Sequence, residues 1–169
     1  RESGYWLGKT LAEITKQHVE TSGDQILVIE NEKSYSVQDI YQRAETLAQN
    51  LLAHGLKAGD VISYQLPNWH ETCVINLAAS MIGAIINPLV PIYRHTELRF
   101  MLADVNTRMV FVPEIFRGHE YAAMMVGVAA ELDQTIDVVV LRGACPGALL
   151  YTDLEADPKK PETMPSIDP

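Results

Sequence analysis

The chain has 169 residues, of which 47% are hydrophobic and 21% are charged, a balance typical of a globular protein with a substantial core. Its formal net charge of −9 argues against a general nucleic-acid or anionic-membrane surface, because such a surface needs cations to neutralise phosphates. Neither cysteine has metal or disulfide spacing, and the apolar helical pattern around Cys73 predicts a buried thiol in a reducing compartment.

The first third of the chain is predicted to form two helices separated by a β-hairpin. Thr10 and Glu13, and later Ser36 and Asp39, stand three residues apart, as in the capping box that begins a helix. Gly55 follows the second apolar helical pattern and suits the left-handed residue that ends a helix. The expected elements are a helix within residues 5–20, strands at 26–30 and 34–35, and a helix over residues 36–55.

Strands and helices alternate through the rest of the chain. Asn68 is expected to cap one helix, which Gly83 ends, and Thr96 is expected to cap the next helix. Because strands joined by helices form βαβ crossovers, the sequence predicts an α/β fold with a mostly parallel sheet and helices on both faces. The expected elements are strands at 61–66, directly after 83, at 109–112 and at 137–141, and helices at 69–82, 96–105 and 119–132.

The end of the chain differs from the rest in composition. Residues 155–169 carry four of the nine prolines and lack apolar periodicity, so we expect an α/β region over residues 1–154 and a Pro-rich linker over residues 155–169. The chain starts with Arg1 rather than Met, and both ends are expected to be cut points in a longer protein. No apolar stretch approaches about 18 residues, so no transmembrane segment is expected, and no signal peptide is recognised.

The sequence lacks the common motifs that hold nucleotide phosphates or metal ions. It contains no GxGxxG, GxxxxGK[ST], HExxH or GxSxG pattern. The five histidines share no ligand spacing. We therefore expect neither a metal site nor a catalytic residue within this chain.

Five segments, taken in order, resemble the N-terminal part of AMP-forming acyl-CoA synthetases. Their adenylate-forming superfamily also contains luciferase and the adenylation domains of peptide synthetases. The last of the segments is similar to the branch that acts on short- or medium-chain or alicyclic acids. The segments are GYW and TL within residues 4–11, SYS at 34–36 with the helix to 55, GDVISYQLPN at 59–68, GAIINPLVPIYRHTELRFML at 83–102, and FRGHEYAA at 116–123.

The resemblance implies a two-step ligase reaction in an intact cytoplasmic protein. A carboxylic acid and ATP, with Mg²⁺, give an acyl-adenylate and pyrophosphate, and the thiol of coenzyme A then displaces AMP. The family's phosphate loop, metal-binding acidic residue and C-terminal lysine domain have no counterpart in this sequence. The chain is thus expected to be an N-terminal fragment of the large domain, inactive and without bound cofactor unless joined to the rest of its polypeptide.

Two places are expected, from the resemblance, to lie near coenzyme A. In relatives, the loop that corresponds to Val90, Pro91 and Ile92 borders the coenzyme A channel, and an arginine near Arg117 meets the nucleotide's phosphate. A guanidinium suits phosphate geometry, and the following Gly118 adds no bulk. The other interpretation of Arg117 is a solvated residue at a strand–helix turn.

Two other functions stay open. One is part of an amino-acid adenylation domain that passes its product to a carrier-protein thiol; the FRG and YAA segments, and the absence of a DP-x-YP run at residues 88–94, disfavour it. The other is a freestanding α/β binding module. The polypeptide that follows residue 169 in the gene would separate them, because a Ser/Thr/Gly-rich loop with a lysine would identify the ligase.

Overall fold

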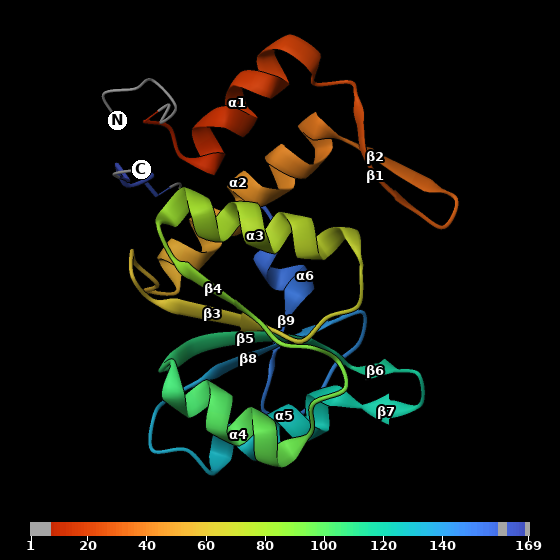
Figure 1. Ribbon diagram of the computed structural model, residues 1–169, viewed down its shortest axis with the longest axis vertical. Coiled ribbons are helices and arrows are strands. Elements are labelled where there is room, and N and C mark those ends of the chain that lie inside the picture. Colours follow the sequence, from red (N-terminus) through yellow and green to blue (C-terminus); the bar gives the residue numbers. More distant parts are fainter. Residues whose placement is uncertain (1–7, 159–161, 168–169) are drawn as a thin grey trace.

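A computed structural model describes residues 8–158 and 162–167, and its five-stranded parallel sheet with helices on both faces confirms the predicted α/β class (Figure 1). None of the helices in these ranges is long and apolar enough to cross a membrane. The helices are α1 (Leu11–Ser22), α2 (Val37–Ala53), α3 (His70–Ile82), α4 (His95–Asp104), α5 (Tyr121–Ala130) and α6 (Tyr151–Leu154). The strands are β1 (Ile26–Glu30), β2 (Lys33–Ser36), β3 (Val61–Tyr64), β4 (Ile85–Pro88), β5 (Thr107–Pro113), β6 (Ile115–Phe116), β7 (His119–Glu120), β8 (Asp137–Leu141) and β9 (Leu149–Leu150).

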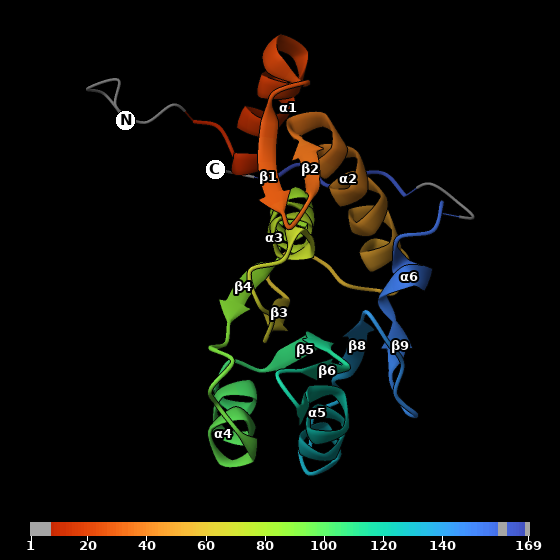
Figure 2. The ribbon, with the colours of Figure 1, turned by 90° about the vertical axis from the view of Figure 1, so that its right-hand side faces the viewer.

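Different helices cover the two faces of the sheet. Helices α2, α3 and α6 pack on one face, and α4 and α5 pack on the other, as Figures 1 and 2 show. In β5, Met109 and Phe111 face the first layer whereas Val110 and Val112 face the second, and all four are fully buried. Successive side chains of a strand point to opposite faces, so a strand covered on both sides is apolar throughout.

The strand order places a switch point between β3 and β5. Neighbouring strands follow the order β4-β3-β5-β8-β9. From β3 the chain passes through α3 to β4, whereas from β5 it passes through α5 to β8 at the other side of the sheet. The loops that leave β3 and β5 therefore diverge at the carboxyl ends of these strands, where open α/β sheets usually hold their ligands.

Most of the predicted helix ends are confirmed. Both capping boxes, at Thr10 and Ser36, are present. Gly83 ends α3 in the left-handed conformation, with φ of 71°. Helix α2 ends at Ala53, and Gly55 follows it with φ of 85°. These ends are set by interactions within a few residues, which is why the sequence predicts them.

The two other predicted caps are wrong. Helix α3 begins at His70, and its first amide donates a hydrogen bond to the Glu30 carboxylate (2.9 Å) rather than to the side chain of Asn68. Helix α4 begins one residue before Thr96, with Arg94 as its N-cap. An acceptor that comes from another element, here the β1–β2 hairpin, leaves no signal near the helix in the sequence.

The predicted burial of Cys73 is also wrong, because this side chain is exposed. Helix α3 carries apolar residues around most of its circumference, so the pattern alone could not orient it. In the fold, α3 buries His70 and Glu71 in its first turn and leaves Cys73 at the surface.

The segment after Arg142 is more regular than its sequence pattern indicates. Strand β9 joins the sheet beside β8, and the ring of Tyr151 in α6 packs edge-on against Phe111 with 6.1 Å between centroids. The described residues within 155–158 and 162–167 form no helix or strand, and Met164 packs against the core. The division at residue 154 stays a prediction.

The same substitution, glycine to alanine, is expected to have opposite effects at two positions. Gly127 lies within α5, and nothing lies within 4 Å of the place where its Cβ would stand, so alanine should raise the free energy of unfolding by about 0.5–1 kcal/mol. Gly59 has φ of 86°, where alanine should lower the same quantity by about 1–2 kcal/mol. Urea unfolding of both variants measures the effects; shifts of the same sign would contradict these backbone conformations.

Candidate functional site

Four loops meet at the carboxyl edge of the sheet, around the switch point. They follow β3, β4, β5 and β8 and lie toward the right-hand side of Figure 1, where the β6–β7 hairpin also lies. Val90, Pro91 and Ile92 occupy the loop after β4, and Arg117 occupies the turn of the β6–β7 hairpin after β5. The structure thus brings all four residues that were predicted from sequence to one edge of the sheet.

The loop after β4 presents apolar side chains to solvent. Val90 is 49% exposed and Ile92 is 75% exposed, while Pro91 is half-buried. Buried side chains fix the backbone of the same loop. Its carbonyl oxygens accept hydrogen bonds from the side chains of Gln65 and Tyr121. The loop therefore exposes two apolar side chains at this edge of the sheet.

Three aromatic rings form a row along this edge, and an arginine lies over each ring. The ring centroids of Trp69 and Phe116 are 6.1 Å apart, and those of Phe116 and Tyr121 are 6.5 Å apart. A guanidinium that stacks on an aromatic face can still direct its N–H donors toward an anion. The distances from guanidinium carbon to ring centroid are 3.8 Å for Arg142 on Trp69, 5.3 Å for Arg117 on Phe116 and 5.5 Å for Arg94 on Tyr121.

Arg117 differs from the other two arginines of the row. Arg142 pairs with two carboxylates, and Arg94 donates to backbone carbonyl oxygens. Within residues 8–158 and 162–167, the exposed side chain of Arg117 forms no ion pair and no hydrogen bond. Arg117 and Gly118 both have positive φ, 49° and 75°, and form the tight turn that presents the guanidinium. Its donors are therefore available to an anion from solution.

The sequence did not predict a network of ion pairs that adjoins the row of rings. Arg142, which stacks on Trp69, belongs to both the row and the network. The Nη2 atom of Arg142 is 2.6 Å from an oxygen of Glu30 and 2.6 Å from an oxygen of Glu71, and Nδ1 of His70 is 2.8 Å from Glu30. Burial of the Glu30 carboxyl acts to raise its pKa, but hydrogen bonds from His70 and Arg142 outweigh burial and hold the pKa at about 2. The ring of Tyr35 stacks on His70, with 4.0 Å between centroids.

The network contains residue types that can ligate metal ions. Ligand atoms of Glu30, His70 and Glu71 lie within 4.8 Å of one another. Arg142, however, engages both carboxylates, and its charge opposes a second cation. We therefore interpret the group as an ion network that joins the β1–β2 hairpin to α3 and to the end of β8. Arg142 and Glu71 are 71 residues apart, so no local pattern could have indicated this contact.

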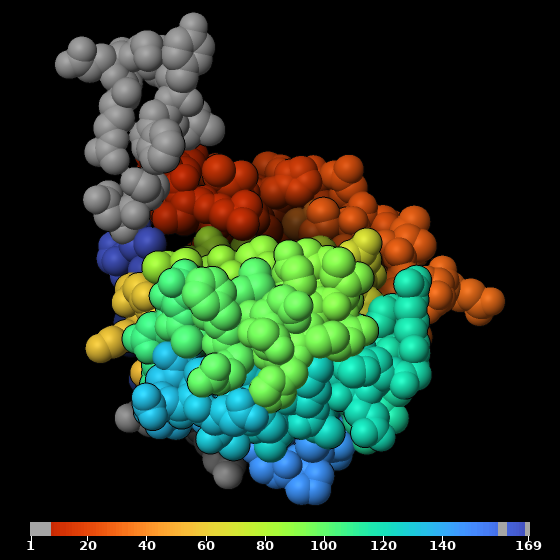
Figure 3. All heavy atoms as spheres, turned by 60° about the horizontal axis from the view of Figure 1, so that its bottom comes forward, coloured from red at the N-terminus to blue at the C-terminus, as the bar shows by residue number. Residues whose placement is uncertain are grey.

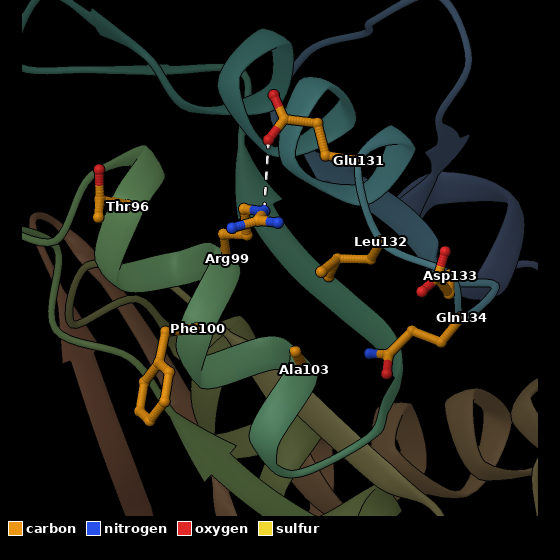
Figure 4. A pocket seen from close by; sticks show the side chains of 8 residues that line it. All are labelled: Thr96, Arg99, Phe100, Ala103, Glu131, Leu132, Asp133 and Gln134. Atoms are coloured by element: carbon orange, nitrogen blue, oxygen red, sulfur yellow. Dashed lines mark ion pairs between the residues drawn. The ribbon is translucent and has the colours of Figure 1, made fainter.

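A hollow of about 670 Å³ lies between α4 and the segment that follows α5 (Figure 4). Figure 3 brings this face of the molecule forward, with α4 in green. Arg99 and Glu131 form an ion pair across the hollow, with 3.6 Å between Nε and Oε2. Gln134, at its other end, donates to the carbonyl oxygen of Leu102 and reaches Thr107 at the start of β5. The hollow thus lies toward the amino ends of the strands, away from the predicted residues.

The fold is that of an α/β protein whose rings and arginines gather at the carboxyl ends of the strands, the place where open α/β sheets usually hold their ligands. Residues 15–169 match the family described as AMP-binding enzyme. The match covers most of the chain, and the chain therefore belongs to the AMP-binding enzyme family.

Similar proteins agree with this membership. The chain is 34% identical over 140 residues to the medium-chain fatty-acid–CoA ligase of Escherichia coli, covering 82% of this chain and 25% of that protein. It is 30% identical over 156 residues to salicylyl-CoA synthase / salicylate adenylyltransferase of a Streptomyces species, covering 92% of this chain and 28% of that protein. The chain thus spans between a quarter and a third of these relatives.

Solved structures support the fold. A putative long-chain-fatty-acid CoA ligase from Rhodopseudomonas palustris matches with a TM-score of 0.84 at 22% identity, covering 96% of this chain and 39% of that one. The anthranilate CoA ligase AuaEII matches with a TM-score of 0.80 at 15% identity, covering 92% of this chain and 29% of that one. At such identities the likeness concerns the arrangement of helices and strands.

Replacement of Glu30 by glutamine is expected to remove an acid-sensitive part of the stability. The folded pKa of about 2 lies below the ordinary value of 4.5, so the carboxylate's contribution is complete above about pH 4.5 and is lost as the pH falls toward 2. Glutamine does not titrate. The variant should lose about 1–3 kcal/mol of unfolding free energy at neutral pH, because it leaves Arg142 with a weaker partner, and this deficit should shrink in acid.

Urea unfolding at pH 7 and at pH 3 measures the deficit. Glu32→Gln is the matched control, since Glu32 lies on the same hairpin but is exposed and should change little at either pH. A deficit of equal size at both pH values would contradict the assigned role of the Glu30 charge.

Proposed function

We propose that this chain is the N-terminal part of an ATP-dependent, AMP-forming ligase that joins a carboxylic acid to coenzyme A. The observation that carries the proposal is the family match over residues 15–169. The relatives described as a medium-chain fatty-acid–CoA ligase and a salicylyl-CoA synthase favour coenzyme A as the acceptor. Short- to medium-chain or cyclic acids are the substrates that we favour, from the resemblance of residues 116–123.

The proposed reaction has two steps in the whole protein. A carboxylate oxygen attacks the α-phosphorus of ATP and releases pyrophosphate, which gives an acyl-adenylate. The coenzyme A thiol then attacks the acyl carbon, and AMP leaves with the oxygen that joined it to the acyl group. Glu30 and Glu71 do not fit a magnesium site, because Arg142 engages both carboxylates, so we assign the Mg²⁺ that accompanies ATP to no residue of this chain.

Within this reaction we assign the carboxyl edge to coenzyme A. The exposed Val90 and Ile92, with the half-buried Pro91 between them, would lie along its pantetheine arm and offer it an apolar contact surface. The free guanidinium of Arg117 would bind a phosphate of its nucleotide, because charge-assisted bonds to phosphate are strong and Arg117 has no carboxylate beside it in the described part of the chain. The chain supplies these contacts, and the remainder of the same polypeptide would supply the chemistry.

A second candidate is an adenylation unit that does not use coenzyme A. It is favoured by 24% identity to the 2,3-dihydroxybenzoate-AMP ligase of Bacillus subtilis over 168 residues, and by 25% identity to triostin synthetase I of Streptomyces triostinicus over 169 residues. Both candidates form an acyl-adenylate, so the two differ only in the acceptor thiol. Thioester formation with free coenzyme A distinguishes them.

The chain by itself is expected to be inactive, whereas the longer protein encoded by the same gene is expected to form acyl-adenylates. The physical reason is that we assign none of the residues that the structure describes to the activation of the α-phosphorus. Carboxylate-dependent exchange of labelled pyrophosphate into ATP measures the first step for both. Exchange by the 169-residue chain would show that it holds its own catalytic groups and would overturn the fragment proposal.

In the longer protein, Arg117→Ala is expected to raise the KM for coenzyme A by about tenfold or more, because one charge-assisted phosphate bond is lost. Pyrophosphate exchange should stay nearly unchanged, since coenzyme A takes no part in that step. Arg99→Ala, which removes an exposed guanidinium from the hollow beside α4, is the control and should leave both quantities alone. If the KM for coenzyme A is unchanged in Arg117→Ala, Arg117 is a solvated surface residue that does not bind coenzyme A.

A further inference from the structure

A fully buried amide lies directly beneath the loop after β4. Gln65 follows the last residue of β3, and its backbone N–H continues the strand pairing by donating to the carbonyl oxygen of Phe111 (2.9 Å). This pairing fixes the direction of the side chain. Its Nε2 atom donates to the carbonyl oxygens of Val90 and Tyr93, both at 3.0 Å. One amide group thus uses both of its hydrogens on a single loop.

The carbonyl oxygen of the Gln65 amide gives evidence that the two bonds from Nε2 have a role. This atom, Oε1, is buried and has no hydrogen-bond partner in the part of the chain that the structure describes. Burial of an unpaired polar atom costs about 1–3 kcal/mol, so an apolar side chain of similar size would fill the same space at lower cost. An amide at this position is therefore best explained by what its two donors hold.

A second side chain holds the same loop from the opposite side of the switch point. Tyr121, the first residue of α5, is 4% exposed, and its hydroxyl donates to the carbonyl oxygen of Pro91 (2.8 Å). Arg94, which stacks on the ring of Tyr121, donates to the same oxygen at 2.7 Å and to that of Tyr93 at 2.8 Å. Donors from the residue after β3 and from α5 therefore converge on three carbonyl oxygens of one short loop.

This arrangement decides which way the loop faces. Residues 90–93 lie outside the strands, and an internal backbone hydrogen bond runs from the N–H of Tyr93 to the carbonyl oxygen of Val90 (3.1 Å). Because Pro91 offers no N–H, the loop lacks the hydrogen-bond ladder that would orient a strand. With the carbonyl oxygens held inward, the side chains of Val90 and Ile92 stay outward. Without the donors, the carbonyl oxygens would turn to water, and the apolar side chains would turn toward the protein.

We propose that Gln65 and Tyr121 are positioning residues that clamp the Val90–Tyr93 loop in the conformation that receives coenzyme A. The link to coenzyme A rests on the proposed function; the clamp itself rests on the hydrogen bonds alone. Because Tyr121 directly follows β7, the clamp also joins this loop to the hairpin that carries Arg117. The two contact regions assigned to one ligand are thereby held at a fixed separation.

The test uses Gln65→Leu and Tyr121→Phe in the longer protein, since each removes donors and keeps most of the volume. Both are expected to raise the KM for coenzyme A about fivefold, with pyrophosphate exchange within twofold of the wild type. Backbone hydrogen exchange at residues 89–94, measured without ligand, is expected to become at least tenfold faster. A packing defect would instead lower the rates of both half-reactions. It would speed hydrogen exchange at residues 89–94 no more than in the surrounding residues.

The chain offers a matched control for each variant. Tyr151→Phe removes a buried hydroxyl that has no hydrogen-bond partner in the described residues, and Gln49→Leu removes an amide whose buried Oε1 likewise has none. Both lie away from the loop, in α6 and α2, and should change neither the KM nor the exchange at residues 89–94. If Gln65→Leu fails to fold, Tyr121→Phe still tests the clamp, because it deletes only one oxygen atom and should leave the fold intact.

The outcomes separate the clamp from the proposed function. Unchanged hydrogen exchange at residues 89–94 in Tyr121→Phe would overturn the clamp, whatever the kinetics show. Faster exchange with an unchanged KM for coenzyme A, in an enzyme that does use coenzyme A, would overturn the assigned role of the clamp. If the wild-type protein forms adenylates but no coenzyme A thioester, the proposed function fails, and faster exchange would still support the clamp.

Discussion

The central sheet has helices on both faces, and this constraint decides where chemistry can occur. Side chains of β5 and β8 are apolar on both faces because each face packs against helices, so these strands have no room for a ligand along their length. Polar and charged groups gather instead where the strands end. The chain turns in opposite directions after β3 and β5, so the loops part at that edge. The row of rings and arginines, the apolar loop and the ion network all lie around this place.

The ion network places charged groups from three separate segments of the chain in contact with one another. Arg142 lies between Glu30 and Glu71 and at the same time covers the ring of Trp69. Breaking such a group by removing one partner is much more harmful than its net contribution suggests, because a charge stays buried without compensation. The network therefore serves to hold the β1–β2 hairpin and the first turn of α3 in place. Its residues are engaged with one another, which separates it from the free Arg117.

The loop after β4 shows how an irregular segment can be as well defined as a strand. It lacks a hydrogen-bond ladder, but Gln65 and Tyr121 direct its carbonyl oxygens inward from two sides. The same contacts leave the apolar side chains of Val90 and Ile92 exposed to solvent. The chain belongs to the AMP-binding enzyme family, and the contact of this loop with coenzyme A is our proposal for the longer protein.

The sequence by itself determined the features that depend on neighbours a few residues away. The alternation of strands and helices, the capping boxes at Thr10 and Ser36 and the left-handed Gly83 were all predicted, because propensity, capping and periodicity act locally. The resemblance also indicated Val90, Pro91, Ile92 and Arg117, although it could not show that one edge gathers them. Only the tertiary structure decided that Glu30 caps α3, that Cys73 is exposed and that Gln65 lies beneath the loop. Each of these depends on a contact between elements far apart in the chain, and such contacts leave no periodic trace in the sequence.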